Sequence, residues 1–395
     1  MNKNFANNRV ILIACMITAF ITSFMSSALN LSVPSLENYF SSNASTVSWV
    51  VAAYTLTVAA LSLPIGKIAD SRGRRIVFLT GAIGFSIFSF LSIFSKSIGM
   101  IIAFRVLQGS SAAMIFATQN AILISAFPHS VQGKMLGSSV AATYVGLTAG
   151  PVFGGMLNTY FGWKAIFLVS SGIAFIAFIL SIFVIPEDKI EVTNSGKPDY
   201  IGSLMYVAAV FMSLFGMSNI TASNLAKPIF AAGIVFIALF FMYESKRENP
   251  IMKVSMFTGS KTFTFSNIAA LLNYGATFAI SYTLSIYLQM VKGFSSNIAG
   301  LVLILMPAIQ AVLSPVMGSI SDRVRPAYLA SFGMGLCAAA LGMFSFVSEN
   351  SSISYIGAAL VIAGTGFAMF SSPNNNAIMN CVEPKDYGIA NSIIA

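Results

Sequence analysis

The sequence contains the stretch Gly146-Leu147-Thr148-Ala149-Gly150-Pro151-Val152-Phe153-Gly154-Gly155 within an apolar run from about Met135 to Leu157. A run of this length can cross a bilayer as a helix. Gly146, Gly150 and Gly154 recur every four residues, so they share one helix face, and a neighbouring helix can approach that face closely. Pro151 bends the helix, which a membrane tolerates where neighbours or a water-filled cavity satisfy the freed carbonyl. Glycine spacing alone therefore predicts a tight helix-packing seam in a membrane protein.

The composition of the whole chain is that of a membrane protein. Of the 395 residues, 56% are hydrophobic and 8% are charged, whereas about a quarter of the residues in a soluble domain are charged. Cys15, Cys337 and Cys381 lie far apart, so we interpret them as packing residues rather than a disulfide framework. The sequence has a single histidine, no Cys/His cluster and no phosphate-binding Gly-Lys loop. These features argue against an enzyme, a metal site and a bound cofactor.

Twelve apolar runs approach the roughly 20 residues that a membrane-crossing helix needs. They lie at about 10–30, 47–66, 76–95, 99–122, 135–157, 164–185, 201–220, 227–243, 264–287, 297–319, 327–347 and 353–372. Helices satisfy all their backbone groups internally, so the predicted fold class is all-α, a polytopic membrane protein.

The positive charges are distributed unequally between the two ends of the predicted helices. Sixteen Lys and Arg fall in the amino terminus and the even-numbered connections, but only four lysines fall in the odd-numbered ones: Lys96, Lys164, Lys227 and Lys292. This asymmetry predicts a multi-pass protein of the cell membrane with a cytoplasmic amino terminus. It also accounts for the net charge of +9 without a nucleic-acid partner.

The full glycine pattern carries more information than its spacing. Gly146, Gly150, Pro151, Gly154 and Gly155 fill every fixed position of a motif that resembles the antiporter motif of major facilitator superfamily exporters. In that family the motif lies between the two halves of the transporter and marks drug exporters rather than importers. The resemblance extends over the chain and is to the fourteen-helix drug exporters in particular.

A second motif follows the second apolar run. Gly66-Lys67-Ile68-Ala69-Asp70-Ser71-Arg72-Gly73-Arg74-Arg75 resembles the superfamily's loop motif, although Ser71 stands where an arginine is usual. We predict a gating role for Gly66, Asp70, Gly73 and Arg74, with Asp70 accepting hydrogen bonds from a helix N-terminus or an arginine of the partner half. The alternative is that the arginines only set the topology.

The second half of the chain weakly repeats the first. Gly66-Lys67-Ile68-Ala69-Asp70 matches Gly318-Ser319-Ile320-Ser321-Asp322 at an offset of 252 residues, as expected for the parallel six-helix repeats of this superfamily. We predict a first bundle over 1–186, a linker with two extra membrane helices over 187–262, and an incomplete second bundle over 263–395. On this offset the chain stops before two further helices, which predicts a fragment or premature stop of a fourteen-helix protein; the alternative is a twelve-helix protein with unequal repeats.

Arg105 lies deep in the fourth apolar run, where a charged side chain is costly and by default functional. With Gln108 it resembles the superfamily's fourth-helix motif, in which the arginine supports proton transfer. The alternative is an arginine that stabilises the bundle through carbonyls or waters.

The carboxylate that usually accompanies such an arginine is missing. Asn30 and Pro34 match the end of the first-helix pattern Leu-Asp-x-Thr-x-x-Asn-x-x-x-Pro of the fourteen-helix exporters, but Met25 occupies the Asp position. Three routes for proton coupling remain open: an acid beyond this sequence, coupling through Asp70 and Arg105, or protonation of the substrate.

Polar side chains within apolar runs outline a predicted substrate cavity, with Met25 at the position of the missing acid. The candidates are Met25, Asn30, Gln119, Asn120, Tyr144, Asn273, Tyr274 and Gln310. Each polar residue alone is more often an interhelical hydrogen bond than a ligand contact. Because no carboxylate is among them, we expect large apolar or aromatic substrates rather than small cations.

These features predict a monomeric secondary active transporter that exports small amphipathic compounds by alternating access, with protons as the coupling ion and the lipid bilayer as its surroundings. The glycine helix would be the sliding surface between the halves. The alternatives are a non-transporting or degenerate membrane sensor of the same fold, and an exporter of another small metabolite.

Overall fold

Six long helices and one short helix make up the first half of the chain. The computed structural model describes residues 2–187, 199–220, 223–247, 249–294 and 296–394. The helices of the first half are α1 (Asn2–Ala28), α2 (Val33–Phe40), α3 (Ala44–Arg72), α4 (Arg74–Ser92), α5 (Ile98–Ala126), α6 (Gln132–Phe161) and α7 (Trp163–Val184). Short 3-10 turns, η1 (Leu29–Ser32) and η2 (His129–Val131), precede α2 and α6.

A helical hairpin separates this half from the second. It consists of α8 (Tyr200–Ser218) and α9 (Ala226–Glu244). The second half contains α10 (Ser255–Gly259), α11 (Lys261–Ile286), the π-helical turn η3 (Tyr287–Val291), α12 (Ser296–Leu303), α13 (Leu305–Ser321), α14 (Pro326–Ser345), α15 (Ile353–Asn380), η4 (Pro384–Asp386) and α16 (Tyr387–Ile394). Residues 188–198, at the start of the linker predicted over 187–262, lie outside the described residues.

The prediction of an all-α membrane protein is confirmed, but the number of spans differs. Eleven helices of the described chain are long and apolar enough to cross a membrane, instead of twelve. The predicted run at 264–287 forms α11, which is not among the eleven. Its Thr, Ser, Asn and Tyr side chains reduce its hydropathy, and several of them line a cavity described below.

Glycines make the sharp connections between neighbouring helices of the first half. Gly73 (φ 106°) joins α3 to α4, and Gly162 (φ 80°) joins α6 to α7. Both conformations lie in the region that glycine adopts without a Cβ penalty. Helices α3 and α5 begin where the side chains of Asn43 and Ser97 accept a hydrogen bond from a first-turn N–H.

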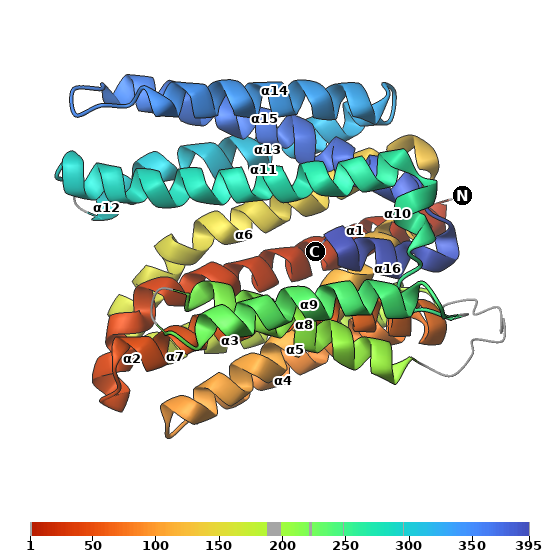
Figure 1. The fold of residues 1–395 in the computed structure, drawn as a ribbon, viewed down its shortest axis with the longest axis horizontal. Coiled ribbons are helices and arrows are strands. Elements are labelled where there is room, and N and C mark those ends of the chain that lie inside the picture. The colour runs from red at the N-terminus through yellow and green to blue at the C-terminus, as the bar shows by residue number, and fades with distance from the viewer. Residues whose placement is uncertain (1, 188–198, 221–222, 248, 295, 395) are drawn as a thin grey trace.

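Helix α6 lies between the two halves. It packs against α1 on one side and against α13 and α15 on the other (Figure 1). The largest buried apolar cluster is in the first half, around Phe78, Phe85 and Phe167. The last helix, α16, lies against α3 and α5 of the first half.

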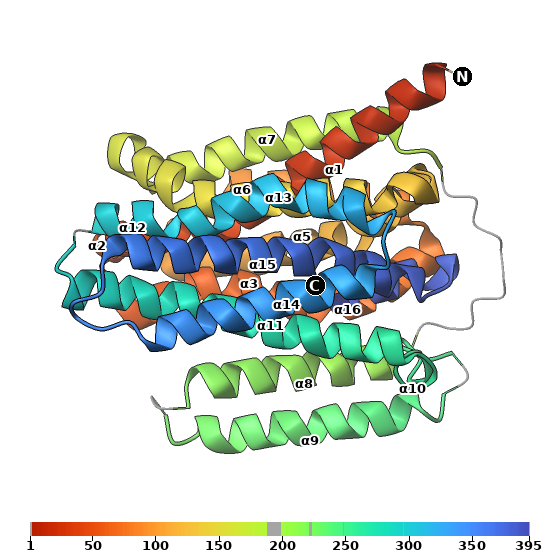
Figure 2. The same ribbon diagram turned by 90° about the horizontal axis from the view of Figure 1, so that it is seen from above.

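The hairpin of α8 and α9 lies at one edge of the molecule (Figure 2). It packs against α3, and Trp49 of α3 stacks on Phe215 of α8 with ring centroids 5.5 Å apart. Such a peripheral place suits an insertion between two bundles. The boundaries at 186 and 262 stay predictions.

Candidate functional site

A cavity of about 1430 Å³ lies between the two halves. Its lining comes from α1, α3, α5 and α6 of the first half and from α11, α12, α13, α15 and α16 of the second. None of the described residues that line it is charged. The volume exceeds the roughly 300–1,000 Å³ of typical small-molecule sites, so the cavity can accept a large ligand.

Five of the eight predicted cavity residues line this space, namely Gln119, Asn120, Tyr144, Tyr274 and Gln310. Their contribution to binding stays a prediction. Because they come from α5, α6, α11 and α13, a ligand in the cavity would contact both halves of the chain.

Three of the predicted cavity residues, Met25, Asn30 and Asn273, do not line this cavity. Met25 is fully buried within the first half, and Asn30 is exposed in the turn η1. Asn273 is 2% exposed and its amide nitrogen contacts Met334 Sδ at 3.0 Å, on α14. A position within an apolar run does not fix which neighbour a helix face meets, and these three faces meet protein or solvent instead of the cavity.

Side-chain amides connect the two halves at the inner end of the cavity. Asn120 Nδ2 donates to Asn391 Oδ1 at 2.6 Å, which links α5 to α16. Asn391 Nδ2 in turn donates to the carbonyl of Phe116. Gln119 Nε2 donates to Ser139 Oγ at 2.5 Å within the first half. A movement that separates α5 from α16 must break the Asn120–Asn391 bond.

An aromatic cluster crosses the interface between the halves. Tyr144 of α6 meets Phe367 of α15 edge-on with centroids 5.4 Å apart, and Tyr274 of α11 meets the same ring at 5.3 Å. Aromatic pairs of this geometry contribute about 0.5–1.5 kcal/mol beyond their buried area. All three residues line the cavity, so they offer ring edges and faces to an aromatic ligand.

Gln310 of α13 is a cavity residue with unused hydrogen-bonding capacity. It is 1% exposed, and its Nε2 has no hydrogen-bond partner. A buried donor without a partner costs about 1–3 kcal/mol. A ligand acceptor in the cavity would remove that cost.

Small hydroxyl residues form much of the remaining lining, and the sequence reasoning missed them. They include Thr22, Ser139, Thr143, Thr277 and Ser371, together with the amides of Asn375 and Asn391. The polar positions of α11 repeat along one face, and this periodicity could have indicated Thr277 in advance.

Arg105 lies behind the cavity wall and contacts carbonyls and amides. It is fully buried, its Nε donates to the carbonyl of Val50 at 2.8 Å, and one of its terminal nitrogens donates to Gln108 Oε1 at 2.6 Å. Its guanidinium lies 4.2 Å from the ring centroid of Tyr54, which separates it from the cavity. No carboxylate of the described chain pairs with it. This arrangement favours the alternative in which Arg105 stabilises the bundle.

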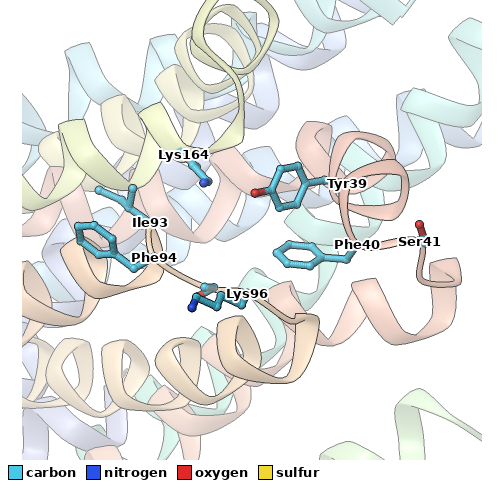
Figure 3. Close-up of a pocket in the computed structure, with 8 residues that line it drawn as sticks. Tyr39, Phe40, Ser41, Ile93, Phe94, Lys96 and Lys164 are labelled. Carbon is cyan, nitrogen blue, oxygen red and sulfur yellow. The ribbon is translucent and has the colours of Figure 1, made fainter.

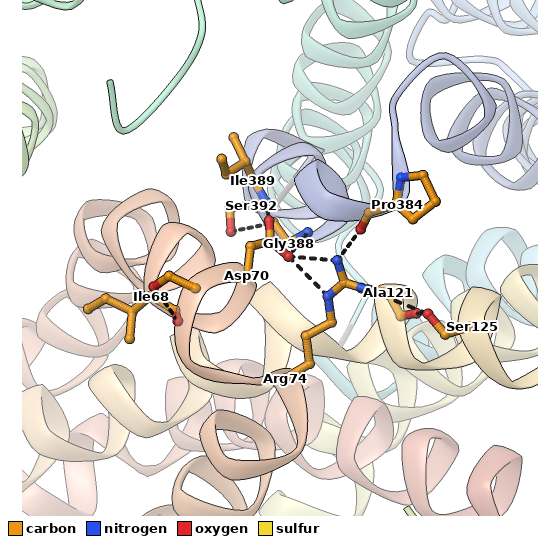
Figure 4. Close-up of polar contacts among 10 residues, drawn as sticks. Ile68, Asp70, Arg74, Ala121, Ser125, Pro384, Gly388, Ile389 and Ser392 are labelled. Carbon is orange, nitrogen blue, oxygen red and sulfur yellow. Dashed lines mark hydrogen bonds and ion pairs between the residues drawn. The ribbon is translucent and has the colours of Figure 1, made fainter. Parts of the chain in front are cut away.

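Asp70 joins the end of α3 to the first turn of α16. Its carboxylate accepts the backbone N–H groups of Gly388 at 2.9 Å and Ile389 at 3.0 Å, and it pairs with Arg74 at 2.8 Å (Figure 4). Arg74 also donates to the carbonyl of Pro384. A helix N-terminus favours a negative charge at this position. We call this set the Asp70 contact; it matches the hydrogen bonding predicted for Asp70.

An equivalent contact lies at the matching position of the internal repeat. Asp322, which follows α13, accepts the N–H groups of Gly133 at 2.6 Å and Lys134 at 3.0 Å in the first turn of α6. Partial burial raises the pKa of the Asp322 carboxyl, while these two donors and His129 act in the opposite direction. We call this the Asp322 contact. The repeat of Gly66–Asp70 as Gly318–Asp322 was the signal that could have identified it.

Both contacts close the same end of the molecule, because α3 and α13 end there and α6 and α16 begin there. At the opposite end the cavity is open, since its lining residues Tyr160 and Leu301 are 73% and 70% exposed. We refer to the two ends as the contact end and the open end. The structure therefore has one closed and one accessible end.

The comparisons with known proteins agree with this architecture. The family model described as Major Facilitator Superfamily matches residues 15–395. The chain belongs to the major facilitator superfamily. The chain is 30% identical to the riboflavin transporter RibZ of Clostridioides difficile over 98% of this chain and 84% of that protein. It is also 27% identical to the methylenomycin A resistance protein of Streptomyces coelicolor (96% and 81%) and 26% identical to the multidrug resistance protein Stp of Mycobacterium tuberculosis (93% and 68%).

Two solved structures of transporters share the fold. The proton:xylose symporter XylE superposes with a TM-score of 0.66 at 14% identity, covering 99% of this chain and 86% of XylE. The human organic anion transporter MFSD10 superposes with a TM-score of 0.69 at 13% identity, covering 100% and 90%. The members of this superfamily are transporters, so the prediction that the chain is not an enzyme is confirmed.

Within this major facilitator fold, the glycine motif faces α1 and not the second half. A Cβ added to Gly154 would lie 2.8 Å from the Cβ of Ala28, and Gly146 and Gly150 face Phe20 and Ser27 of the same helix. These three glycines therefore pack within the first half, and the surface on which α6 would slide between the halves, predicted from the glycine motif, is not made by them. The contact of α6 with α13 comes from Gly133 and Gly137, near its start. The motif positions Pro151 and Gly155 line the cavity.

Proposed function

We propose that this chain is a proton-driven secondary transporter that exports small amphipathic compounds by alternating access. The observation that carries the proposal is the uncharged cavity between two halves that the Asp70 and Asp322 contacts join at one end only. Rocking of two related bundles about a central site is the usual mode of such folds. Breaking both contacts would open the contact end, and closure around Tyr160 and Leu301 would seal the other.

We propose Asp70 and Asp322 as the carboxylates that couple protons to this movement. They bridge the halves, whereas no acid lines the described part of the cavity. Because burial raises the pKa of Asp322, this carboxyl takes up a proton more readily than it would in water. The predicted relay through Arg105 and Gln108 stays a prediction and is weakened by the missing carboxylate partner.

We also propose the cell membrane as the location, a cytoplasmic contact end and amino terminus, and a monomer as the working unit. The excess of Lys and Arg at the contact end supports this orientation. The hairpin α8–α9 supports the finer assignment to the exporters with two helices inserted between the bundles.

A second candidate is transport of a flavin-like compound, in which an aromatic ring system carries many hydroxyl groups. The cavity combines the Tyr144–Phe367–Tyr274 cluster with hydroxyl and amide side chains and no charge. The named activity of RibZ makes riboflavin the first compound to test.

Transport by the full chain in liposomes with an imposed pH gradient tests both candidates. We expect accumulation of uncharged aromatic compounds to exceed that of ethidium, a cation, and to collapse when an ionophore removes the gradient. Riboflavin transport would select the second candidate. If no compound accumulates above empty liposomes, the non-transporting alternative replaces the proposal.

A further inference from the structure

A second pocket, of about 600 Å³, lies at the open end of the first half and away from the central cavity. It is formed by the end of α2, the connection between α4 and α5, and the start of α7. Figure 3 shows Tyr39 and Phe40 across a gap from Ile93 and Phe94, with Lys164 and Lys96 on its two sides.

Two of the few lysines expected at this end converge on the pocket. Lys96 and Lys164 come from different connections, and neither forms an ion pair with a carboxylate of the described chain. Lys164 Nζ lies 5.4 Å from the ring centroid of Tyr39 and 5.6 Å from that of Trp163. The rings hold this ammonium group without neutralising it. The pocket therefore has two positive charges, and no carboxylate among the described residues is paired with either of them.

A buried hydroxyl gives independent support for a ligand here. Ser95 lines the pocket and is 3% exposed, and its Oγ has no hydrogen-bond partner. A buried polar atom without a partner is unfavourable, and an anionic oxygen in the pocket would satisfy it. Two ammonium groups and a hydroxyl are suitable donors for a phosphate group.

The aromatic walls indicate what the phosphate is attached to. Phe94 is 57% exposed and Tyr39 is 55% exposed, and both lie at the open end of the first half. Aromatic side chains at the ends of membrane-crossing helices commonly meet the bilayer interface. An apolar body beside the phosphate would cover both rings. We propose that this pocket binds a phosphate group through Lys96, Lys164 and Ser95, either in the headgroup of an anionic phospholipid or as free phosphate.

Thermal unfolding of the purified full chain tests the proposal and separates the two sources. One arm compares nanodiscs of phosphatidylcholine with nanodiscs that also contain phosphatidylglycerol. The other adds inorganic phosphate in detergent, against chloride at equal ionic strength. We expect phosphatidylglycerol, inorganic phosphate or both to raise the Tm; a response to phosphatidylglycerol alone assigns the headgroup, and a response to inorganic phosphate alone assigns the free ion.

Variants connect the response to the pocket. We expect the double variant Lys96→Gln/Lys164→Gln to weaken binding about tenfold or more, because two charge-assisted contacts are lost. Ser95→Ala should reduce the response without lowering the Tm of the unliganded protein. The matched control is Lys227→Gln, an exposed lysine at the start of α9 and outside the pocket. The proposal is overturned if neither ligand raises the wild-type Tm, or if Lys227→Gln loses as much binding as the double variant.

Discussion

At the residue scale, Asp70 and Asp322 make equivalent contacts in the two halves of the chain. Each carboxylate accepts two successive backbone N–H groups from the first turn of a helix in the other half. A Cβ on Gly388 would lie 2.7 Å from the Asp70 carboxylate, so a larger residue at this position would displace the carboxylate. These hydrogen bonds form only when the two halves meet at the contact end. Each contact can be broken by changing one aspartate side chain.

Asp70→Asn should open the Asp70 contact selectively. In asparagine an NH₂ group replaces one carboxylate oxygen, and it cannot accept a backbone N–H, so at least one N–H···O bond is lost. A hydrogen bond to a charged group contributes about 1.5–3 kcal/mol, so the contact is weakened by an amount of this order. We expect faster hydrogen exchange at the amides of Gly388 and Ile389, measured by mass spectrometry. Asp322→Asn is the matched control. It should accelerate exchange at the amides of Gly133 and Lys134 and have a smaller effect at those of Gly388 and Ile389. Unchanged exchange at Gly388 in Asp70→Asn would refute the assignment.

Arg105 should act as a structural residue. Replacing it by Gln leaves the Val50 carbonyl and the Gln108 side chain without their donor, so we expect a lower Tm and a loss of transport that follows the loss of folded protein. Arg105→Lys keeps the charge but not the planar fork, and should have an intermediate Tm. A folded Arg105→Gln protein with normal Tm and no transport would instead support the proton-relay role.

At the element scale, the sequence predicted the helices better than their neighbours. Hydropathy identified eleven of the spans because a helix in lipid must be apolar along its length. It did not identify the face that each helix turns to its partners, which depends on packing between distant segments. The glycines of α6 are an example. Their spacing predicted a tight helix-packing seam, and the structure contains one, but the helix that packs against these glycines is α1 of the same half. The Asp70 contact was predictable because its motif carries both position and chemistry.

The seam between α1 and α6 should be essential for stability. In Gly154→Leu the new side chain meets Ala28, with its carbonyl oxygen 2.9 Å from the Cβ position, so α1 must move. We expect destabilisation of about 1–3 kcal/mol or more, as for other overpacked sites, measured by thermal unfolding in detergent. Gly172→Leu on α7 is the matched control, because no atom lies within 4 Å of its Cβ position. Equal Tm values for the two variants would contradict the seam.

At the scale of the whole molecule, the two contacts lie at one end of the interface between the halves and the cavity opens at the other end. The Asp70 contact links α3 to α16, the Asp322 contact links α13 to α6, and the cavity opens at the opposite end. Because the contacts lie on either side of the same end, a rigid rocking movement has to break both. Loss of one contact should therefore shift the balance between the closed and open forms of the whole protein.

Spin-label distances at both ends should change in opposite directions when a contact is lost. One pair of labels replaces Arg72 and Arg325 at the contact end, and another replaces Tyr160 and Leu301 at the open end; all four positions are exposed, and Cys381→Ser removes the exposed native thiol. In Asp70→Asn we expect a longer Arg72–Arg325 distance and a shorter Tyr160–Leu301 distance, since about 1.4 kcal/mol already changes the ratio of two states tenfold. The same labels without the Asp70 change provide the reference populations. If the contact end opens while the distance across the cavity mouth stays fixed, the two ends are not coupled and the halves do not rock as rigid bodies.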